Sequence, residues 1–178
     1  MELTDLTIEQ FMYVSLLIET YKDNENKLKQ EIIKYIYKKD VGSVSNRDAD
    51  KTIQSIFSML QDKPNFIQRF IYQGVEYGFI PNLDDISTGE FCDLDDYLSA
   101  DEKQLNRIAA ILYRPITKSL GNMYQIEPYE GTAKYSETMK GVSYKTVMGA
   151  VVFFWNLSKS LLEASNIYIQ KEVKNLTK

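Results

Sequence analysis

The chain has 178 residues, a length that suits one well-filled domain. Hydrophobic residues make up 44% and charged residues 26% of it, which excludes a collagenous or intrinsically disordered chain. The net charge of −4 argues against broad binding to nucleic acid, and the absence of histidine excludes a histidine-based triad or an HExxH zinc site.

The first part of the chain, residues 1–62, is predicted to form three helices. Its start, MELTDLTIEQ, lacks the basic and then apolar order of a signal peptide, so none is expected. Thr7 followed by Gln10 is typical of a capping box that opens the first helix. Apolar residues at helical spacing predict a second helix, packed antiparallel to the first, and a third that ends before Pro64.

The middle part, residues 63–143, changes to aromatic and β-branched residues around turn signals. We expect one β-hairpin to turn near Gly74 and a second at Gly121-Asn122, and the two hairpins to join in a small antiparallel sheet. Two short helices are predicted between them. Each is opened by a capping box, Ser87 with Glu90 and Ser99 with Glu102.

The last part, residues 144–178, is predicted to be one long helix as far as about residue 174. Its apolar run of 11 residues, VMGAVVFFWNL, is too short to cross a bilayer, so no membrane contact is expected. The apolar residues form two stripes instead of one. The surface of this helix around Phe153, Phe154 and Trp155 is therefore a candidate for binding a partner chain or a second copy of the protein.

Eight carboxylates and no Lys or Arg lie between residues 79 and 102. They are Asp84, Asp85, Glu90, Asp93, Asp95, Asp96, Asp101 and Glu102. Helix capping and helix dipoles explain part of this pattern, and an acidic partner-binding surface of Asp84, Asp85, Asp93, Asp95 and Asp96 is the next reading. A metal or catalytic site is the third, although the spacing does not fit a calcium-binding loop.

Other chemistry finds little support. No glycine-rich nucleotide motif occurs, and we expect no cofactor, no metal ligand and no catalytic residue. Cys92 is the only cysteine, which excludes a disulfide within the chain and fits a reducing compartment; it is expected to be a small buried hydrophobe. Arg114 is expected to stabilise a helix end or to pair with the acidic stretch.

Four segments in order, YGFIPNLDDISTGEFCDLDDYL, AILYRPI, YQIEPYEGT and GAVVFFWNL, resemble small proteins of tailed bacteriophages, notably crAss-like phages. The resemblance covers roughly residues 66 to 160. It implies a virion component or an assembly protein, such as a ring, connector, cargo or assembly-chaperone protein. It carries over no functional residue.

The sequence thus predicts a single α+β, predominantly helical domain over residues 1–178, with three N-terminal helices, a small antiparallel sheet and a long C-terminal helix. The predicted function is that of a non-enzymatic phage structural or assembly protein. Its partners would be portal, tail or capsid proteins or a second copy, in the virion or in the host cytoplasm during assembly. The alternatives are a cation-dependent enzyme using the stretch from Asp84 to Glu102 and an inhibitor of a host protein.

Overall fold

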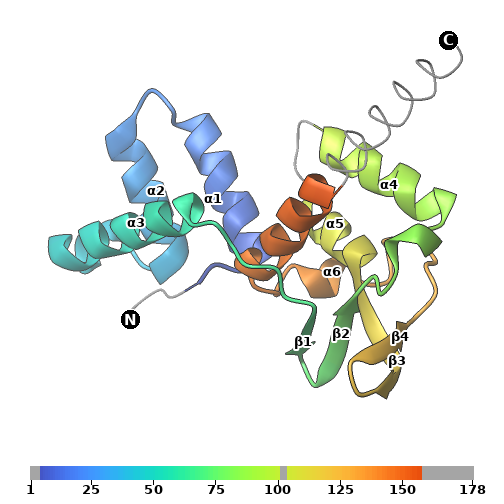
Figure 1. Cartoon of the computed structure of the whole chain (residues 1–178). Coiled ribbons are helices and arrows are strands. Elements are labelled where there is room, and N and C mark those ends of the chain that lie inside the picture. The colour runs from blue at the N-terminus through green and yellow to red at the C-terminus, as the bar shows by residue number, and fades with distance from the viewer. Residues whose placement is uncertain (1–4, 101–103, 158–178) are drawn as a thin grey trace, which may run out of the picture.

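The computed structural model describes residues 5–100 and 104–157, and it has the α+β architecture that the sequence predicts (Figure 1). Three helices lie together at the N-terminal side of the molecule. They are α1 (Ile8–Thr20), α2 (Glu25–Tyr37) and α3 (Asn46–Gln61), with the short 3-10 helix η1 (Val41–Ser43) before α3. The remaining helices and the sheet form the other side.

The starts of the three N-terminal helices are fixed by local hydrogen bonds. The hydroxyl of Thr7 accepts the N–H of Gln10, and the side chain of Gln10 accepts the N–H of Thr7, which confirms the predicted capping box. At α2 and α3 the cap is a single hydrogen bond: the side chains of Asn24 and Ser45 each accept one backbone N–H of the helix that follows. Such caps satisfy N–H groups that have no partner inside a helix.

Both predicted hairpins are present and join in one antiparallel sheet of order β1-β2-β3-β4. Its strands are β1 (Arg69–Tyr72), β2 (Val75–Phe79), β3 (Tyr113–Leu120) and β4 (Met123–Ile126). Gln73 and Gly74 both have positive φ, 50° and 78°, as a tight two-residue hairpin turn requires, and Gly121 has φ 59° in the second turn. Strand β3 starts before Pro115, whose carbonyl accepts the N–H of Glu127 at 2.9 Å.

The second hairpin bends across the first, because the pairing of β3 with β4 shifts register between Ile116 and Lys118. The ring of Tyr124 lies on Gly78, where an added Cβ would approach Tyr124 Cε2 to 2.4 Å. The Tyr124 hydroxyl donates to the Phe79 carbonyl at 2.7 Å. A glycine on β2 is therefore what lets β4 cross so closely.

The helices between the hairpins correct one prediction. After the 3-10 helix η2 (Leu83–Asp85), α4 spans Thr88–Ser99 and opens with the predicted Ser87–Glu90 capping box. The next helix, α5 (Leu105–Leu112), is preceded by Gln104, which makes no side-chain cap. The prediction that Ser99 caps this helix is wrong, because Ser99 is the last residue of α4; residue 102 lies outside the described residues.

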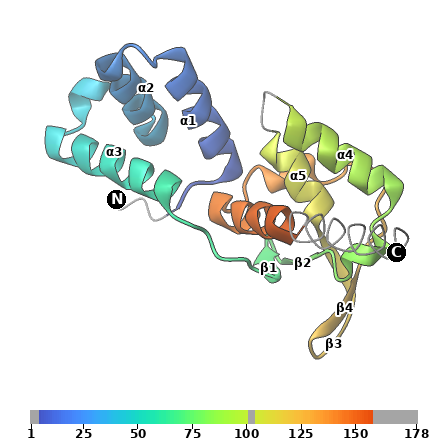
Figure 2. The same ribbon diagram turned by 45° about the horizontal axis from the view of Figure 1, so that its top comes forward.

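A further helix begins at residue 144 and is described as far as residue 157, so the predicted continuation to residue 174 lies outside the described residues. It follows the short α6 (Ser136–Met139) and runs through the middle of the molecule, between the N-terminal helices and the sheet (Figure 2). Gly149 is pressed against the chain, since an added Cβ would lie 2.1 Å from the Asn65 carbonyl oxygen. No described helix is long and apolar enough to cross a membrane.

The N-terminal helices are tied to the start of this helix. The backbone N–H of Ile8 donates to the Val142 carbonyl at 2.9 Å, and the backbone N–H of Tyr144 donates to the Leu6 carbonyl at 2.8 Å. The rings of Phe11 and Tyr144 stack with centroids 4.0 Å apart. The buried apolar residues of the two sides accordingly form one cluster, from Ile32 and Ile56 to the sheet.

The two serines predicted as caps offer a matched test. Ser87→Ala removes a hydroxyl that accepts a helix N–H, so we expect it to lower the free energy of unfolding by about 0.5 to 2 kcal/mol. Ser99→Ala removes no cap and should leave the denaturant midpoint nearly unchanged. Equal midpoints for the two variants in chemical unfolding would contradict the observed end of α4.

Candidate functional site

The structure divides the acidic stretch into a buried part and an exposed part. Glu90 is buried, and Asp93 is half-buried on the same side of α4. Asp84 and Asp85 on η2 are exposed, and so are Asp95 and Asp96 on α4. Of the five aspartates in the predicted surface, four are exposed and Asp93 is half-buried.

The buried part centres on an ion pair between Glu90 and Arg114. The two side chains are 6% and 8% exposed, respectively, and Glu90 Oε1 accepts a hydrogen bond from Arg114 Nη1. Glu90 Oε2 accepts the N–H of Ser87 at 2.8 Å. Arg114 Nη1 also lies 3.4 Å from the Ile111 carbonyl at the end of α5. Arg114 thus does both things that the sequence suggests, pairing with the acidic stretch and binding a helix end.

Asp93 and Tyr129 complete this buried network. The Arg114 guanidinium lies over the Tyr129 ring, 5.6 Å from its centroid, and the Tyr129 hydroxyl donates to Asp93 Oδ2. Burial and the neighbouring Asp93 carboxylate raise the pKa of Tyr129, so the phenol keeps its proton and acts as a donor. The contacts join α4, β3 and the loop after β4, which gives these residues a structural role.

The pKa of Glu90 is lowered from its ordinary value of about 4.5. Burial, the largest influence, raises it, but hydrogen bonds from Ser87 and Arg114 and the charge of Arg114 together outweigh burial. The folded state therefore binds the Glu90 carboxyl proton less tightly than the unfolded chain does. At pH values above about 4.5 the ionised Glu90 stabilises the fold. The contribution is lost as the pH falls through the lower folded pKa.

The opposite face of α4 points to solvent. Phe91 and Asp95, one helical turn apart, lie on it beside Asp96 and Cys92. The prediction that Cys92 is buried is wrong, because the buried side of α4 is taken by Glu90 and Leu94. The exposed aspartates form no ion pair with any described residue.

Metal binding gains no geometric support from these carboxylates. Within residues 5–100 and 104–157, no group of three or more carboxylate or cysteine side chains lies close enough to hold a metal ion. Asp85 instead accepts a hydrogen bond from Asn82 Nδ2 at 2.8 Å.

The predicted apolar surface on the helix over 144–157 is partly exposed. Phe154 is half-buried, and Phe153 stacks on Phe66 with ring centroids 4.3 Å apart. Trp155 is 65% exposed, next to the exposed Val152. Val147 on the same helix is fully buried, so one side of the helix faces the core while the side of Val152 and Trp155 faces outward. Of the three predicted aromatics, Phe153 and Phe154 are partly packed against the fold and Trp155 is largely exposed.

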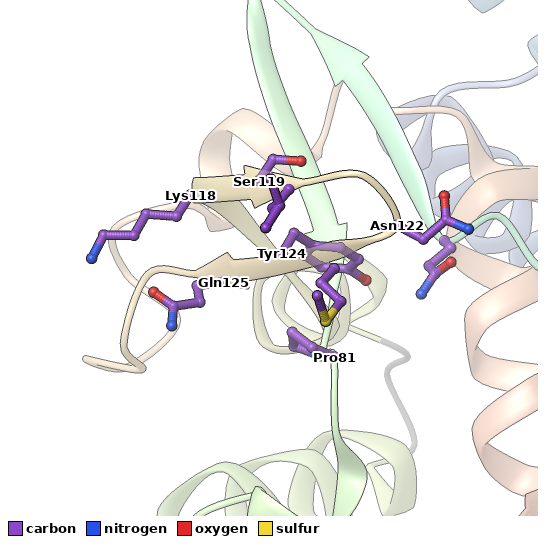
Figure 3. A pocket seen from close by; sticks show the side chains of 9 residues that line it. Pro81, Lys118, Ser119, Asn122, Tyr124 and Gln125 are labelled. Carbon is purple, nitrogen blue, oxygen red and sulfur yellow. The ribbon is translucent and has the colours of Figure 1, made fainter.

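Sequence reasoning missed a groove beside the second hairpin. It has a volume of about 580 Å³ and lies where β3 and β4 cross in front of the first hairpin (Figure 3). Its lining residues are Gln68, Pro81, Lys118, Ser119, Leu120, Asn122, Met123, Tyr124 and Gln125. The available signal was the segment SLGNMY, in which Leu120 and Met123 flank a turn that normally carries polar residues.

Comparison of the chain with protein-family models, with curated proteins and with solved structures gave no match.

We expect Glu90→Gln to destabilise the fold by about 3 to 5 kcal/mol at neutral pH, since it leaves the Arg114 charge buried without its partner. Glutamine can still accept the N–H of Ser87, so the change isolates the loss of charge. The variant should also lose less stability on acidification than the wild type. Urea unfolding between neutral and acidic pH measures both effects.

The matched control is Glu137→Gln, which removes an exposed carboxylate paired with Lys140. Exposed pairs of this kind stabilise proteins little, so its unfolding curve should follow that of the wild type. A similar loss in both variants would show that burial of the Glu90 pair is unimportant.

A second expectation concerns cations. Since the exposed aspartates do not converge, calorimetric titration with Mg²⁺, Ca²⁺ or Mn²⁺ should give no saturable heat. Micromolar binding that disappears in Asp95→Asn would contradict the placement of this residue on a solvated surface.

Proposed function

We propose that this chain is a non-enzymatic bacteriophage virion or assembly protein that acts by binding other protein chains. The observation that carries the proposal is the exposure of Trp155. A tryptophan side chain that stays in water forgoes a large gain from burial, and tryptophan is enriched where protein interfaces bury their central contacts.

The surroundings of Trp155 support this role. Val152 adds exposed apolar surface one turn earlier, and Phe153 is held in place by its stack on Phe66. The indole is thus presented by a helix whose other side is packed in the core. A partner that covers it meets a preordered surface and loses little side-chain entropy on binding.

The exposed aspartates suit contacts with protein rather than with nucleic acid. Asp84, Asp85, Asp95 and Asp96 place exposed negative charge on η2 and α4, and none of them forms an ion pair with a described Lys or Arg. A phosphate backbone is repelled by this charge, whereas a basic protein surface is attracted. Portal, tail and capsid proteins are the proposed partners, in the host cytoplasm during assembly and in the particle.

The same acidic surface supports one second candidate, an inhibitor that imitates nucleic acid and occupies a basic site of a host protein. The protein content of purified phage particles distinguishes the two roles. Mass spectrometry of purified particles should find this chain at a fixed ratio to the capsid protein if it is a virion component. Its absence from particles, together with a stable complex with a host protein, would favour inhibition.

Trp155 also serves as a probe, because it is the only tryptophan of the chain. Binding of a portal or tail protein should shift its fluorescence to shorter wavelength, and Trp155→Ala should weaken binding by about 2 kcal/mol or more. Leu16→Ala, which shortens an exposed apolar side chain on α1, is the matched control and should bind normally. Unchanged affinity of the Trp155→Ala variant would contradict the proposed contact.

A further inference from the structure

The groove beside the second hairpin has a simple chemistry. Its rim is apolar, formed by Leu120 and Met123, which are 76% and 71% exposed, and by Pro81. Among its lining residues Lys118 carries the only charge, and no carboxylate lines it. Lys118 forms no ion pair with any residue that the structure describes. A ligand that places an apolar group next to a carboxylate matches this groove.

The groove is held in shape by contacts across the sheet. Arg69 on β1 donates to the Gly121 carbonyl at 3.2 Å and to the Ser119 hydroxyl at 2.9 Å. Its guanidinium lies over the ring of Tyr124, 5.2 Å from the centroid. These bonds fix the tip of the second hairpin against the first, so the groove is formed before any ligand arrives.

The chain itself carries a surface of the matching kind. On α4, Phe91 is 52% exposed, and the exposed Asp95 follows it by one turn on the same face. The Glu90–Arg114 pair turns this face outward. Figures 1 and 2 show α4 and the second hairpin at opposite ends of the C-terminal half, so one copy cannot fill its own groove.

We infer that the groove binds the α4 face of a second copy, with Phe91 between Leu120 and Met123 and Asp95 beside Lys118. The methionine thioether is a favourable neighbour for an aromatic ring, and the two charges are complementary. The contact joins different surfaces of the two copies, so it propagates from copy to copy into a ring or an open chain. This inference rests on the proposed function, because it names a second copy as one of the protein partners.

The exposed apolar surface around Trp155 is a poorer match for the groove. Val152 and Trp155 bring no carboxylate to Lys118, and neither does the half-exposed Phe153. Burying the lysine without a counter-charge is unfavourable. The α4 face supplies both the aromatic ring and the carboxylate.

Charge reversal tests the contact in sedimentation velocity. The wild type should show a sedimentation coefficient that rises with concentration, and Lys118→Glu or Asp95→Lys should each weaken the association by about tenfold or more. The double variant, Lys118→Glu with Asp95→Lys, restores complementary charges and should recover much of the wild-type association. Lys51→Glu changes an exposed lysine on α3 by the same charge and should associate like the wild type.

Cysteine cross-linking locates the contact independently of affinity. The wild type carries its single thiol, Cys92, on the α4 face, and Asn122→Cys in a Cys92→Ala background carries its single thiol on the groove. An equimolar mixture under mild oxidation should give mainly dimers linked between positions 92 and 122, identified by peptide mass spectrometry. Random or like-with-like dimers contradict the proposed pairing.

A wild-type chain that stays monomeric at high concentration overturns this inference, as does association that ignores both charge reversals. A monomeric chain that is found in particles and binds a virion protein through Trp155 overturns the inference alone and leaves the proposed function standing. A self-associating chain that is absent from particles overturns the virion role and leaves the inference standing.

Discussion

The buried Glu90–Arg114 pair is the interaction on which the packing of α4 against α5 and β3 depends. One carboxylate oxygen accepts the N–H of Ser87 at the start of α4, and the other pairs with a guanidinium that also reaches the last turn of α5. Two buried charges stabilise a fold only when they have partners. Ser87 supplies one for Glu90, and the Ile111 carbonyl and the Tyr129 ring supply two for Arg114, whose buried Nε has no hydrogen-bond partner among the described residues. The pair therefore sets the rotation of α4 about its axis. That rotation decides which side chains reach the solvent.

Two close approaches of the backbone position the remaining elements. Gly149 lets the helix over 144–157 lie against the chain at Asn65, and Gly78 lets Tyr124 cross β2. The first contact holds the helix between the N-terminal helices and the sheet. The second bends the β3–β4 hairpin across the first hairpin. Any Cβ at either glycine would force these layers apart, because the neighbouring atoms are backbone or a ring that is already hydrogen-bonded.

The surfaces that result differ in chemistry. The α4 face is acidic with one exposed aromatic ring, the helix over 144–157 is apolar around Trp155, and the hairpin groove is apolar with a single positive charge. In the proposed assembly role, each of these surfaces would meet a different neighbour. None of these surfaces gathers three or more carboxylate or cysteine side chains that could hold a metal ion within the described residues.

The sequence by itself determined the features whose partners lie a few residues apart. The Thr7–Gln10 and Ser87–Glu90 capping boxes, and the turns at Gly74 and Gly121, rest on hydrogen bonds and φ preferences that are local, so spacing and residue type were enough. The sequence could not decide which side of α4 is buried, since Cys92 and Glu90 are only two positions apart. Tertiary structure decided this through Arg114, which lies 24 residues away along the chain. It also decided that α4 continues through Ser99, that Trp155 faces outward, and that Leu120 and Met123 edge a groove. Each of these outcomes depends on distant segments packed together, and the pattern of one segment carries no information about its distant neighbours.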